Sequence, residues 1–304
     1  MRVAITGATG FVGRALSRAL DERGDEVVAF TRDPEAAADR LEPEAVAVRW
    51  DPDDVVAIAS SLAGVDAVVN LAGEPVVGKR WTAAQKARIH DSRVHGTRAL
   101  VQALAQAEPR PSVFVSASAI GYYGTSGNQE LDESAPSGTD FLAGVCRDWE
   151  AEALAAQDAG VRTVVIRVGV VLGADGGALP KLLLPFKLFV GGPAGDGQQW
   201  VSWIALDDLV GLVLFAIDQQ RVRGVLNGTA PNPVTNRELS ETIGHVLGRP
   251  SFLPAPSFGI KALLGEAATV VLDGQRVVPA RALELGYGFR FVEPDAALRA
   301  ILGK

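Results

Sequence analysis

The stretch Thr6-Gly7-Ala8-Thr9-Gly10-Phe11-Val12-Gly13 directly follows a short apolar run at residues 2–5. That run predicts a buried strand, and apolar residues then recur at helical spacing at Phe11, Val12, Ala15, Leu16, Ala19 and Leu20. The glycines therefore fall on a strand-to-helix turn, where the lack of a β-carbon lets the backbone turn tightly and approach a phosphate closely. The amides at the start of the helix supply the positive end of its dipole. The stretch predicts a turn that holds the pyrophosphate of a dinucleotide.

The composition favours a globular protein with a small-molecule partner. The chain has 304 residues, of which 48% are hydrophobic, and a formal net charge of -7, which argues against the basic face that nucleic-acid binding requires. Its single cysteine, Cys146, excludes an internal disulfide, and the N-terminal segment lacks the pattern of a signal peptide. The longest apolar stretches are too short to cross a bilayer. We therefore expect a cytoplasmic protein with neither a membrane nor a nucleic acid as its partner.

Apolar runs alternate with amphipathic segments through the first half of the chain. Strands are predicted at 27–30, 46–49, 67–71, 113–116 and 163–168, and helices at 14–23, 82–107 and 141–159. Such alternation implies parallel strands joined by right-handed crossovers. The expected fold class is α/β, a Rossmann-type doubly wound parallel sheet whose ligands bind at the carboxyl ends of the strands.

The residues after the second strand bear on which dinucleotide is bound. The strand is predicted to end at Phe30, and folds that prefer NAD place an acid there, on the adenosine ribose. Thr31 and Arg32 follow instead. A guanidinium pairs with a 2′-phosphate and the threonine hydroxyl adds a hydrogen bond, so this pattern favours NADP(H). Two alternatives stay open, because a shift of register would make Asp33 the ribose acid and Arg32 is also compatible with an ordinary solvated surface.

The second half of the chain is less regular and is rich in turn-forming residues, as at 191–197. We expect an NADP-binding Rossmann domain at 1–172, which residues 198–228 rejoin. Residues 173–197 and 229–304 should form the substrate side and a smaller C-terminal substrate lobe.

Several short motifs together resemble one family. They are Asn70-Leu71-Ala72-Gly73-Glu74-Pro75, Gly78-Lys79-Arg80-Trp81-Thr82, Ser92-Arg93, Val115-Ser116-Ala117-Ser118-Ala119, Val145-Cys146-Arg147-Asp148-Trp149-Glu150, Gln199-Trp200-Val201-Ser202-Trp203, Leu264-Gly265-Glu266 and Asp273-Gly274-Gln275-Arg276. With the glycine turn, the chain resembles the extended, atypical short-chain dehydrogenase/reductase family from end to end. The resemblance is to its uncharacterised NAD-dependent epimerase/dehydratase-like branch, which has a small extra C-terminal domain.

The resemblance implies roles for particular residues. Leu71 and Ala72 would line the adenine-ribose side of the cofactor, Arg93 would reach its phosphates or ribose, and Val168 would lie by the nicotinamide. Core packing is the alternative for the three apolar residues. The full set expected to contact NADP(H) is Gly7, Thr9, Gly10, Phe11, Val12, Thr31, Arg32, Leu71, Ala72, Gly73, Arg93, Ser116 and Val168.

The catalytic pattern of hydride-transferring members is incomplete in this chain. Those members carry Ser or Thr after the fifth strand and Tyr-x-x-x-Lys on the next helix, where the lysine lowers the pKa of the phenol. Ser118 fits the first position, but aligning Glu150 with the family's helical acid puts Leu142 at the tyrosine and Cys146 at the lysine. Neither side chain can do that work. Arg147 is adjacent, but one residue along a helix turns it about 100° away.

Three other residues are candidates for proton transfer. Tyr122 and Tyr123 follow Ser118, and either phenol is a candidate acid, although packing of a turn explains them equally well. Glu74 lies beside the expected crevice and would be a general base if its pKa were raised, or else it caps the loop.

The remaining reactive residues suggest simpler roles. Cys146 has no histidine in a recognisable partnership, so we expect a small buried helix residue rather than a nucleophile. The histidines also lack metal-ligand spacing, and we expect no metal site. Lys79, Arg80 and Trp81 are candidates for binding an anionic or planar substrate, or are a solvated loop and a core anchor.

The leading hypothesis is an NADP(H)-dependent oxidoreductase or epimerase-like enzyme of altered mechanism, with Ser118 and Tyr122 or Tyr123 as its catalytic residues. Its substrate is a small molecule of unknown identity, and a homo-oligomer is compatible with the sequence. The alternative is a catalytically inactive NADP(H)-binding sensor or scaffold. A sugar-nucleotide epimerase with tightly held NAD would need a working acid and an NAD-selective strand end, which the sequence lacks.

Overall fold

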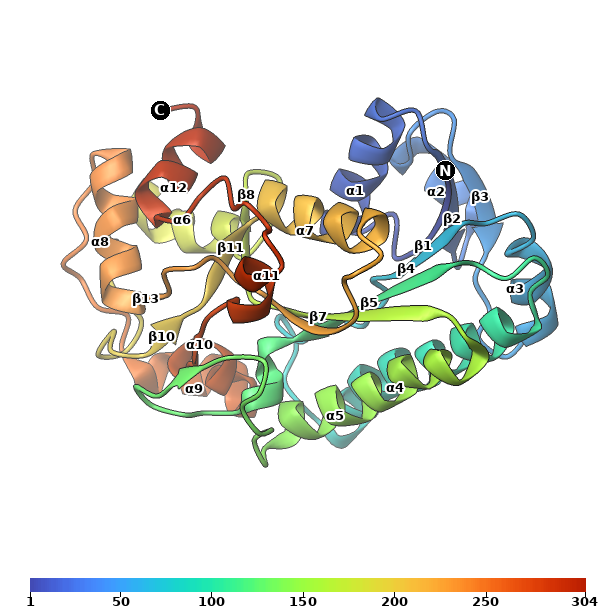
Figure 1. Ribbon diagram of the computed structural model, residues 1–304. Coiled ribbons are helices and arrows are strands. Elements are labelled where there is room, and N and C mark those ends of the chain that lie inside the picture. Colours follow the sequence, from blue (N-terminus) through green and yellow to red (C-terminus); the bar gives the residue numbers. More distant parts are fainter.

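Seven parallel strands form the central sheet of the computed structural model, which describes residues 1–304 (Figure 1). They lie in the order β12-β7-β5-β4-β1-β2-β3, and every neighbouring pair is parallel. Their bounds are β1 Arg2–Thr6, β2 Glu26–Thr31, β3 Val46–Arg49, β4 Ala67–Asn70, β5 Val113–Ala119, β7 Arg162–Val168 and β12 Gly224–Gly228. The strand order reverses at β1, which confirms the doubly wound Rossmann-type sheet.

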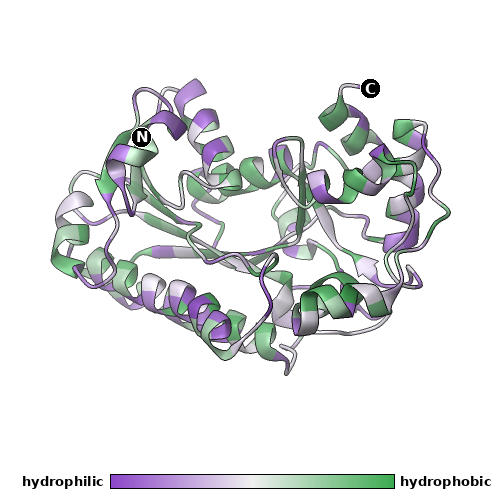
Figure 2. Cartoon of the chain, turned by 180° about the vertical axis from the view of Figure 1, so that it is seen from behind, coloured by the Kyte–Doolittle hydropathy of each residue, from purple (hydrophilic) through white to green (hydrophobic).

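Helices cover both faces of this sheet. On one face lie α1 (Phe11–Glu22) and α7 (Leu206–Asp218), whose apolar side chains share a core with the strands. On the other face lie α3 (Val55–Ser61), α4 (Ala83–Gln106) and α5 (Phe141–Leu154). Much of the central sheet is coloured as hydrophobic in Figure 2, as expected for strands buried on both faces.

A third apolar core joins segments that follow β7. It contains side chains of α6 (Leu179–Lys187), α8 (Asn236–Leu247) and α12 (Pro294–Leu302), packed around the fully buried Trp203. In Figure 1 these helices gather on the side of the molecule opposite β1, β2 and β3. They form the smaller C-terminal lobe, while the domain boundaries expected from the sequence stay a prediction.

Shorter elements connect the sheet and the lobe. The strands are β6 Glu130–Leu131, β8 Val170–Gly173, β9 Gly176–Gly177, β10 Trp200–Val201, β11 Trp203–Ala205, β13 Val234–Thr235 and β14 Arg276–Val277. The helices are α2 Pro34–Ala37, α9 Ser257–Leu264, α10 Thr269–Leu272 and α11 Ala280–Glu284. The 3₁₀ turns are η1 Ala38–Arg40, η2 Ile120–Tyr123, η3 Ala155–Ala159 and η4 Gly265–Ala268. Among them, β14 pairs with β6, and β10 pairs with β13.

Local side-chain caps explain where three of the helices begin. Asp54, Thr82 and Asp140 accept hydrogen bonds from the third residue beyond them, at 3.0, 3.2 and 2.9 Å. The helix expected at 141–159 ends earlier, at Leu154, and continues as η3, whereas the strand expected at 113–116 extends to Ala119. Helix α3 was not foreseen, since it is too short for a clear periodic pattern. None of the helices combines the length and the apolar character that crossing a membrane requires.

Candidate functional site

The glycine-rich turn lies against the end of β4. Gly7 has a φ of 74°, a left-handed conformation that favours glycine, and a β-carbon on it would lie 2.9 Å from the carbonyl carbon of Leu71. A β-carbon on Gly13 would lie 2.2 Å from the Gly7 carbonyl oxygen. Gly10 is the N-cap of α1, and no side chain bonds to the first amides of that helix. The turn therefore presents bare backbone and helix-start amides, which fit a pyrophosphate.

Two guanidinium groups lie at the end of β2 and beside the turn. Thr31 is the last residue of β2, and the exposed Arg32 that follows forms no ion pair and donates no hydrogen bond. The Asp33 carboxylate accepts an amide of α2 at 3.1 Å, so it serves as the N-cap of that helix. Arg40 Nη2 donates to the Thr9 carbonyl at 2.7 Å. The guanidinium groups of Arg32 and Arg40 thus lie near the place expected for the adenosine ribose, and the Asp33 carboxylate is engaged as a helix cap.

A buried polar network joins the ends of three strands. The Thr6 hydroxyl donates to Asn70 Oδ1 at 2.7 Å and accepts the Ala72 amide at 3.2 Å. Asn70 Nδ2 in turn donates to the hydroxyls of Thr97 and Ser116, at 2.8 and 3.2 Å. Ser116 is fully buried in this network, so it braces the end of β4 from within the fold.

Two cavities lie beside the carboxyl ends of β5 and β7, and both border Val168. The larger cavity has a volume of about 370 Å³ and is walled by the loop after β4, by α4 and α5, and by segments of the smaller lobe. The smaller cavity, of about 170 Å³, is lined by Val12 of α1, Leu71 and Ser118, among others. The two cavities therefore lie on either side of Val168, and the smaller one borders the start of α1 through Val12.

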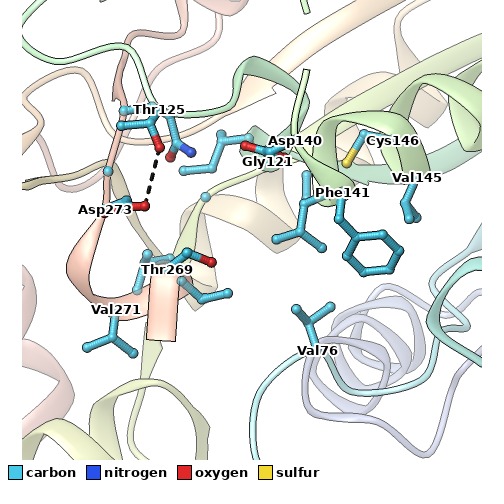
Figure 3. Close-up of a pocket in the computed structure, with 18 of the residues that line it drawn as sticks. Val76, Gly121, Thr125, Asp140, Phe141, Val145, Cys146, Thr269, Val271 and Asp273 are labelled. Carbon is cyan, nitrogen blue, oxygen red and sulfur yellow. Dashed lines mark hydrogen bonds between the residues drawn. The ribbon is translucent and has the colours of Figure 1, made fainter. Parts of the chain in front are cut away.

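The larger cavity has mainly apolar walls with a smaller number of polar groups. Figure 3 shows Phe141, Val145 and Cys146 of α5 on one side and the pair Thr125 and Asp273 on the other. The Thr125 hydroxyl donates to Asp273 Oδ2 at 3.5 Å. Such a cavity suits a small molecule with an apolar body and a few polar groups.

Two α5 positions singled out in the sequence both face the larger cavity. Leu142 and Cys146 line it, one helical turn apart. Cys146 is only 4% exposed, and burial raises the pKa of its thiol to about 11. The thiol is therefore protonated near neutral pH, which supports the expectation of a small buried residue over a nucleophile.

The Phe11 ring packs against three glycines. A β-carbon on Gly173, Gly176 or Gly177 would lie 2.5–2.7 Å from an atom of this ring. These glycines belong to the hairpin of β8 and β9, which therefore packs directly on the start of α1. Phe11 links the glycine turn to the smaller lobe, in addition to any contact with a cofactor.

The Ser118 hydroxyl points into a buried network rather than into the larger cavity. It donates to Glu150 Oε1 at 2.6 Å, and Glu150 forms an ion pair with Arg167 at 2.8 Å. Arg167 Nη1 donates to the Tyr123 hydroxyl at 2.9 Å, and that hydroxyl donates to Asn227 Oδ1 at 2.7 Å. Burial raises the pKa of Tyr123 to about 12. The network ties β5, α5, β7 and β12 together.

Neither tyrosine of the expected catalytic set borders the larger or the smaller cavity. Tyr123 is buried, and the Arg167 guanidinium carbon lies 3.3 Å from the centroid of the Tyr122 ring. Both side chains are absent from the walls of the larger and the smaller cavity, whereas Ser118 borders the smaller one. In the structure both phenols pack within the fold, as in the alternative left open by the sequence, and a catalytic role for them stays a prediction.

The environment of Glu74 is the opposite of what a general base needs. A hydrogen bond from Lys79, at 2.8 Å, lowers the pKa of this carboxyl, and Gln85 donates to the same oxygen at 3.2 Å. These contacts favour the second of the two roles considered, a cap of the loop. Trp81 lines the larger cavity with its ring against Phe141, and its Nε1 donates to a loop carbonyl at 2.9 Å.

The histidines lie away from both cavities. His90 lies between Asp91 and Asp148, 3.1 Å from each, and the hydrogen bond to Asp91 raises the pKa of its imidazole. No group of three or more His, Cys, Asp or Glu side chains is arranged to hold a metal ion.

One wall of the larger cavity comes from within residues 229–304, the stretch expected on the substrate side, but its position in the cavity was not foreseen from its motif. Residues 266–275 of the smaller lobe close over it and include Asp273. A β-carbon on Gly274 would lie 2.1 Å from the Trp200 carbonyl oxygen, and Ser202 Oγ donates to the Gln275 carbonyl at 2.7 Å. The motif Asp273-Gly274-Gln275-Arg276 was the sequence feature that could have indicated this wall. Its packing on residues 199–203 is seen only in the structure.

Comparison with protein families finds two matches in the chain. Residues 3–227 match the NAD dependent epimerase/dehydratase family, and residues 255–301 match a domain of unknown function, DUF1731. The second match contains all of residues 266–275, the cavity wall from the smaller lobe.

Relatives are similar over nearly their whole length. The chain is 48% identical to the chloroplastic epimerase family protein SDR39U1 homolog of Arabidopsis thaliana, over 99% of this chain and 87% of that protein. It is 36% identical to the epimerase family protein YfhF of Bacillus subtilis, over 99% and 98%.

Solved structures share the architecture. The human epimerase family protein SDR39U1 (isoform 2), crystallised with NADPH, is 39% identical, with a TM-score of 0.90 and complete coverage of both chains. A nucleoside-diphosphate sugar epimerase from Corynebacterium glutamicum is 37% identical with a TM-score of 0.80, over 100% of this chain and 58% of that one. The UDP-glucuronic acid 4-epimerase of Bacillus cereus, at 17% identity and a TM-score of 0.79, shares the fold.

Proposed function

Because the chain belongs to the NAD dependent epimerase/dehydratase family, we propose that it binds NADP(H) and acts as an oxidoreductase or epimerase-like enzyme on a small molecule. The observation that carries the cofactor choice is the end of β2, where Arg32 has no ion-pair partner and Asp33 is engaged as a helix cap. An unpaired guanidinium is suited to a 2′-phosphate. The NADPH in the human relative's structure supports the same choice.

The residues from the end of β2 to the end of β7 suit the successive parts of a dinucleotide. Arg32 would hold the 2′-phosphate, and Gly7 and Gly10 would present backbone to the pyrophosphate. Val168, which borders both cavities, would lie by the nicotinamide. When bound, the nicotinamide supplies or accepts a hydride. The larger cavity would then receive the substrate.

The mechanism would differ from that of members with a tyrosine and a lysine. The chain has no Tyr-x-x-x-Lys, and Leu142 and Cys146 face the cavity from α5. Of the expected catalytic residues, only Ser118 borders the smaller cavity, which Val168 also lines. The Ser118 hydroxyl proton, however, is donated to Glu150 in a hydrogen bond. The proposed role of Ser118 is therefore to position the end of β5, through the buried network, rather than to exchange a proton.

A second candidate function is an NADP(H)-binding sensor or scaffold without turnover. It is favoured by the absence of a phenol in the cavity and by the raised pKa of the Cys146 thiol, about 11. The cytoplasmic location expected from the sequence also remains a proposal, since one relative is chloroplastic by name.

The cofactor assignment is tested by fluorescence titration of NADPH and NADH against Arg32→Gln. Losing a charged hydrogen bond to the 2′-phosphate should weaken NADPH binding by roughly 10- to 100-fold and leave NADH binding nearly unchanged. Lys181→Gln, which removes an exposed cation on α6, is the matched control and should change neither. An unchanged NADPH affinity in Arg32→Gln would remove the assignment. Oxidation of NADPH with a panel of carbonyl compounds then separates an enzyme from a sensor.

A further inference from the structure

An apolar surface of the smaller lobe is exposed to solvent. It is formed by the end of α6, by the loop that follows α6, and by the loop between α8 and α9. Its large side chains belong to residues that are 45–73% exposed, namely Leu184, Leu188, Phe189, Val190, Phe252 and Leu253. None of them lines the larger or the smaller cavity. Single exposed apolar residues are common, but a contiguous group of them usually marks an interaction site.

Backbone hydrogen bonds hold the two loops side by side. The Leu253 amide donates to the Gly191 carbonyl at 3.0 Å, and the Ala255 amide donates to the Pro193 carbonyl at 2.8 Å. A β-carbon on Gly192 would lie 2.1 Å from the Leu253 carbonyl oxygen, so the two backbones are in direct contact. The two loops and the end of α6 therefore form one surface, which we call the α6 surface.

The solvent-facing side of α6 continues this surface. Lys181, Leu184 and Leu188 are exposed and recur at intervals of three and four residues, which places them on one side of the helix. The other side carries Leu183 and Phe186, which are buried in the core of the smaller lobe. The helix is thus apolar on both sides, although only one of them packs against the fold.

Phe189 is held in an unfavourable backbone conformation within the α6 surface. Its φ is 62°, and it is the one residue other than glycine with a positive φ. A bulky side chain rarely adopts this conformation, and such strain is concentrated at functional positions. The residue is 55% exposed, and the Arg249 guanidinium carbon lies 4.0 Å from the centroid of its ring. The fold therefore presents an aromatic ring and a cation together to the solvent.

The segments that form the α6 surface carry basic and no acidic side chains. Residues 176–195 and 242–265 contain no Asp or Glu, although the chain has 36 of them. Lys181, Lys187 and Arg249 are exposed and form no ion pair. The whole chain has a net charge of -7, but charges more than about 8 Å away are largely screened at physiological ionic strength. The α6 surface is therefore complementary to a negatively charged partner.

We propose that the α6 surface docks the protein on an anionic phospholipid membrane, where its apolar side chains enter the headgroup region and Lys181, Lys187 and Arg249 face the lipid phosphates. Apolar insertion and attraction to anionic lipids together give stable peripheral binding. A partner helix would instead bind in a groove, whereas these side chains are exposed. The sequence led us to expect no membrane partner because only segments long enough to span a bilayer were considered. The proposal is independent of the proposed function.

The test is co-sedimentation of the full chain with vesicles. One set contains phosphatidylcholine alone, and the other contains one quarter phosphatidylglycerol. At about 0.1 M NaCl, the partition coefficient for the anionic vesicles should be about tenfold or more larger than that for the neutral ones. It should fall at about 0.5 M NaCl, because salt screens the cations.

Phe189→Asn is the first variant, because asparagine tolerates a positive φ and removes the ring. It should weaken binding to the anionic vesicles by about fivefold or more, without lowering the free energy of unfolding in urea. The double variant Lys187→Gln with Arg249→Gln should reduce the preference for anionic vesicles. Val56→Ser is the matched control, since this residue is 68% exposed on α3, at the other side of the molecule (Figure 1), and it should bind as the wild type does.

Three results would overturn the proposal. The first is equal binding, or no binding, of the wild type to both kinds of vesicle. The second is unchanged vesicle binding of Phe189→Asn, which would place the contact elsewhere. The third is a wild-type dimer in analytical ultracentrifugation that Phe189→Asn dissociates, with no vesicle binding, since the α6 surface would then join two copies of the chain.

Discussion

The Ser118 hydroxyl donates a 2.6 Å hydrogen bond to Oε1 of Glu150, and both side chains are buried. The same carboxylate forms an ion pair with Arg167, which is 3% exposed and donates through both Nε and Nη2, at 2.9 and 2.8 Å. The serine after the fifth strand is thus tied to a charge pair that crosses from α5 to β7. Any effect of altering it includes an effect on folding.

Glu150→Gln should therefore destabilise the protein strongly. The substitution leaves the Arg167 guanidinium buried without its counter-charge, which typically costs about 3–5 kcal/mol in the free energy of unfolding. Urea denaturation followed by circular dichroism measures this loss. Glu152→Gln on the same helix removes only a partner of the exposed Arg98 and should change little. Similar losses in the two variants would show that the buried pair contributes no more than a surface pair.

The Cys146 thiol should be almost inert in the native protein. Burial raises its pKa from 9.0 to about 11, so the reactive thiolate becomes abundant only well above neutral pH. At pH 7.5, the thiolate fraction should be about 100-fold smaller than in the unfolded chain. The rate of iodoacetamide alkylation, compared in buffer and in guanidinium chloride, measures this difference. Rapid stoichiometric labelling of the native protein would instead indicate an activated cysteine.

The sequence predicted the fold and the cofactor turn because their signals are local. Gly7 and Gly10 follow an apolar strand and precede a helical pattern, and a strand-to-helix turn has few alternatives for such residues. Arg32 was likewise proposed from its position after a strand. Each of these inferences depends on residues that are near one another in the chain.

The orientation of the candidate catalytic side chains depends instead on distant partners. Tyr123 bonds to Asn227, which is 104 residues away, and Asp273 reaches the cavity only because Gly274 packs on the Trp200 backbone. No local pattern encodes such contacts. A phenol after the fifth strand was therefore equally compatible with a proton donor and with a packed turn.

Replacing Gly176 by alanine should disturb the packing of the β8–β9 hairpin on Phe11, at the start of α1. A β-carbon there would lie 2.5 Å from the Phe11 ring, too close for the ring to remain in place. Gly176→Ala should lower the free energy of unfolding by about 1–3 kcal/mol. Phe11→Leu, a smaller side chain, should recover part of that loss when the two are combined, as a double-mutant cycle by urea denaturation measures. Strictly additive losses would mean that the two residues do not interact.

Arg40 should strengthen cofactor binding without bearing on the chemistry. Its Nη2 donates to the Thr9 carbonyl at 2.7 Å, so it joins η1 to the glycine turn, and its other nitrogens donate to no group of the chain. Arg40→Ala should raise the NADPH dissociation constant by about three- to tenfold, because a tether of the turn and a nearby positive charge are both lost. Arg18→Ala, which removes a guanidinium near Glu42 on the exposed side of α1, is the control and should leave the affinity unchanged. If fluorescence titration gives the same NADPH affinity for both variants, the Arg40 contact is a surface interaction, and Arg32 alone would account for recognition of the phosphate.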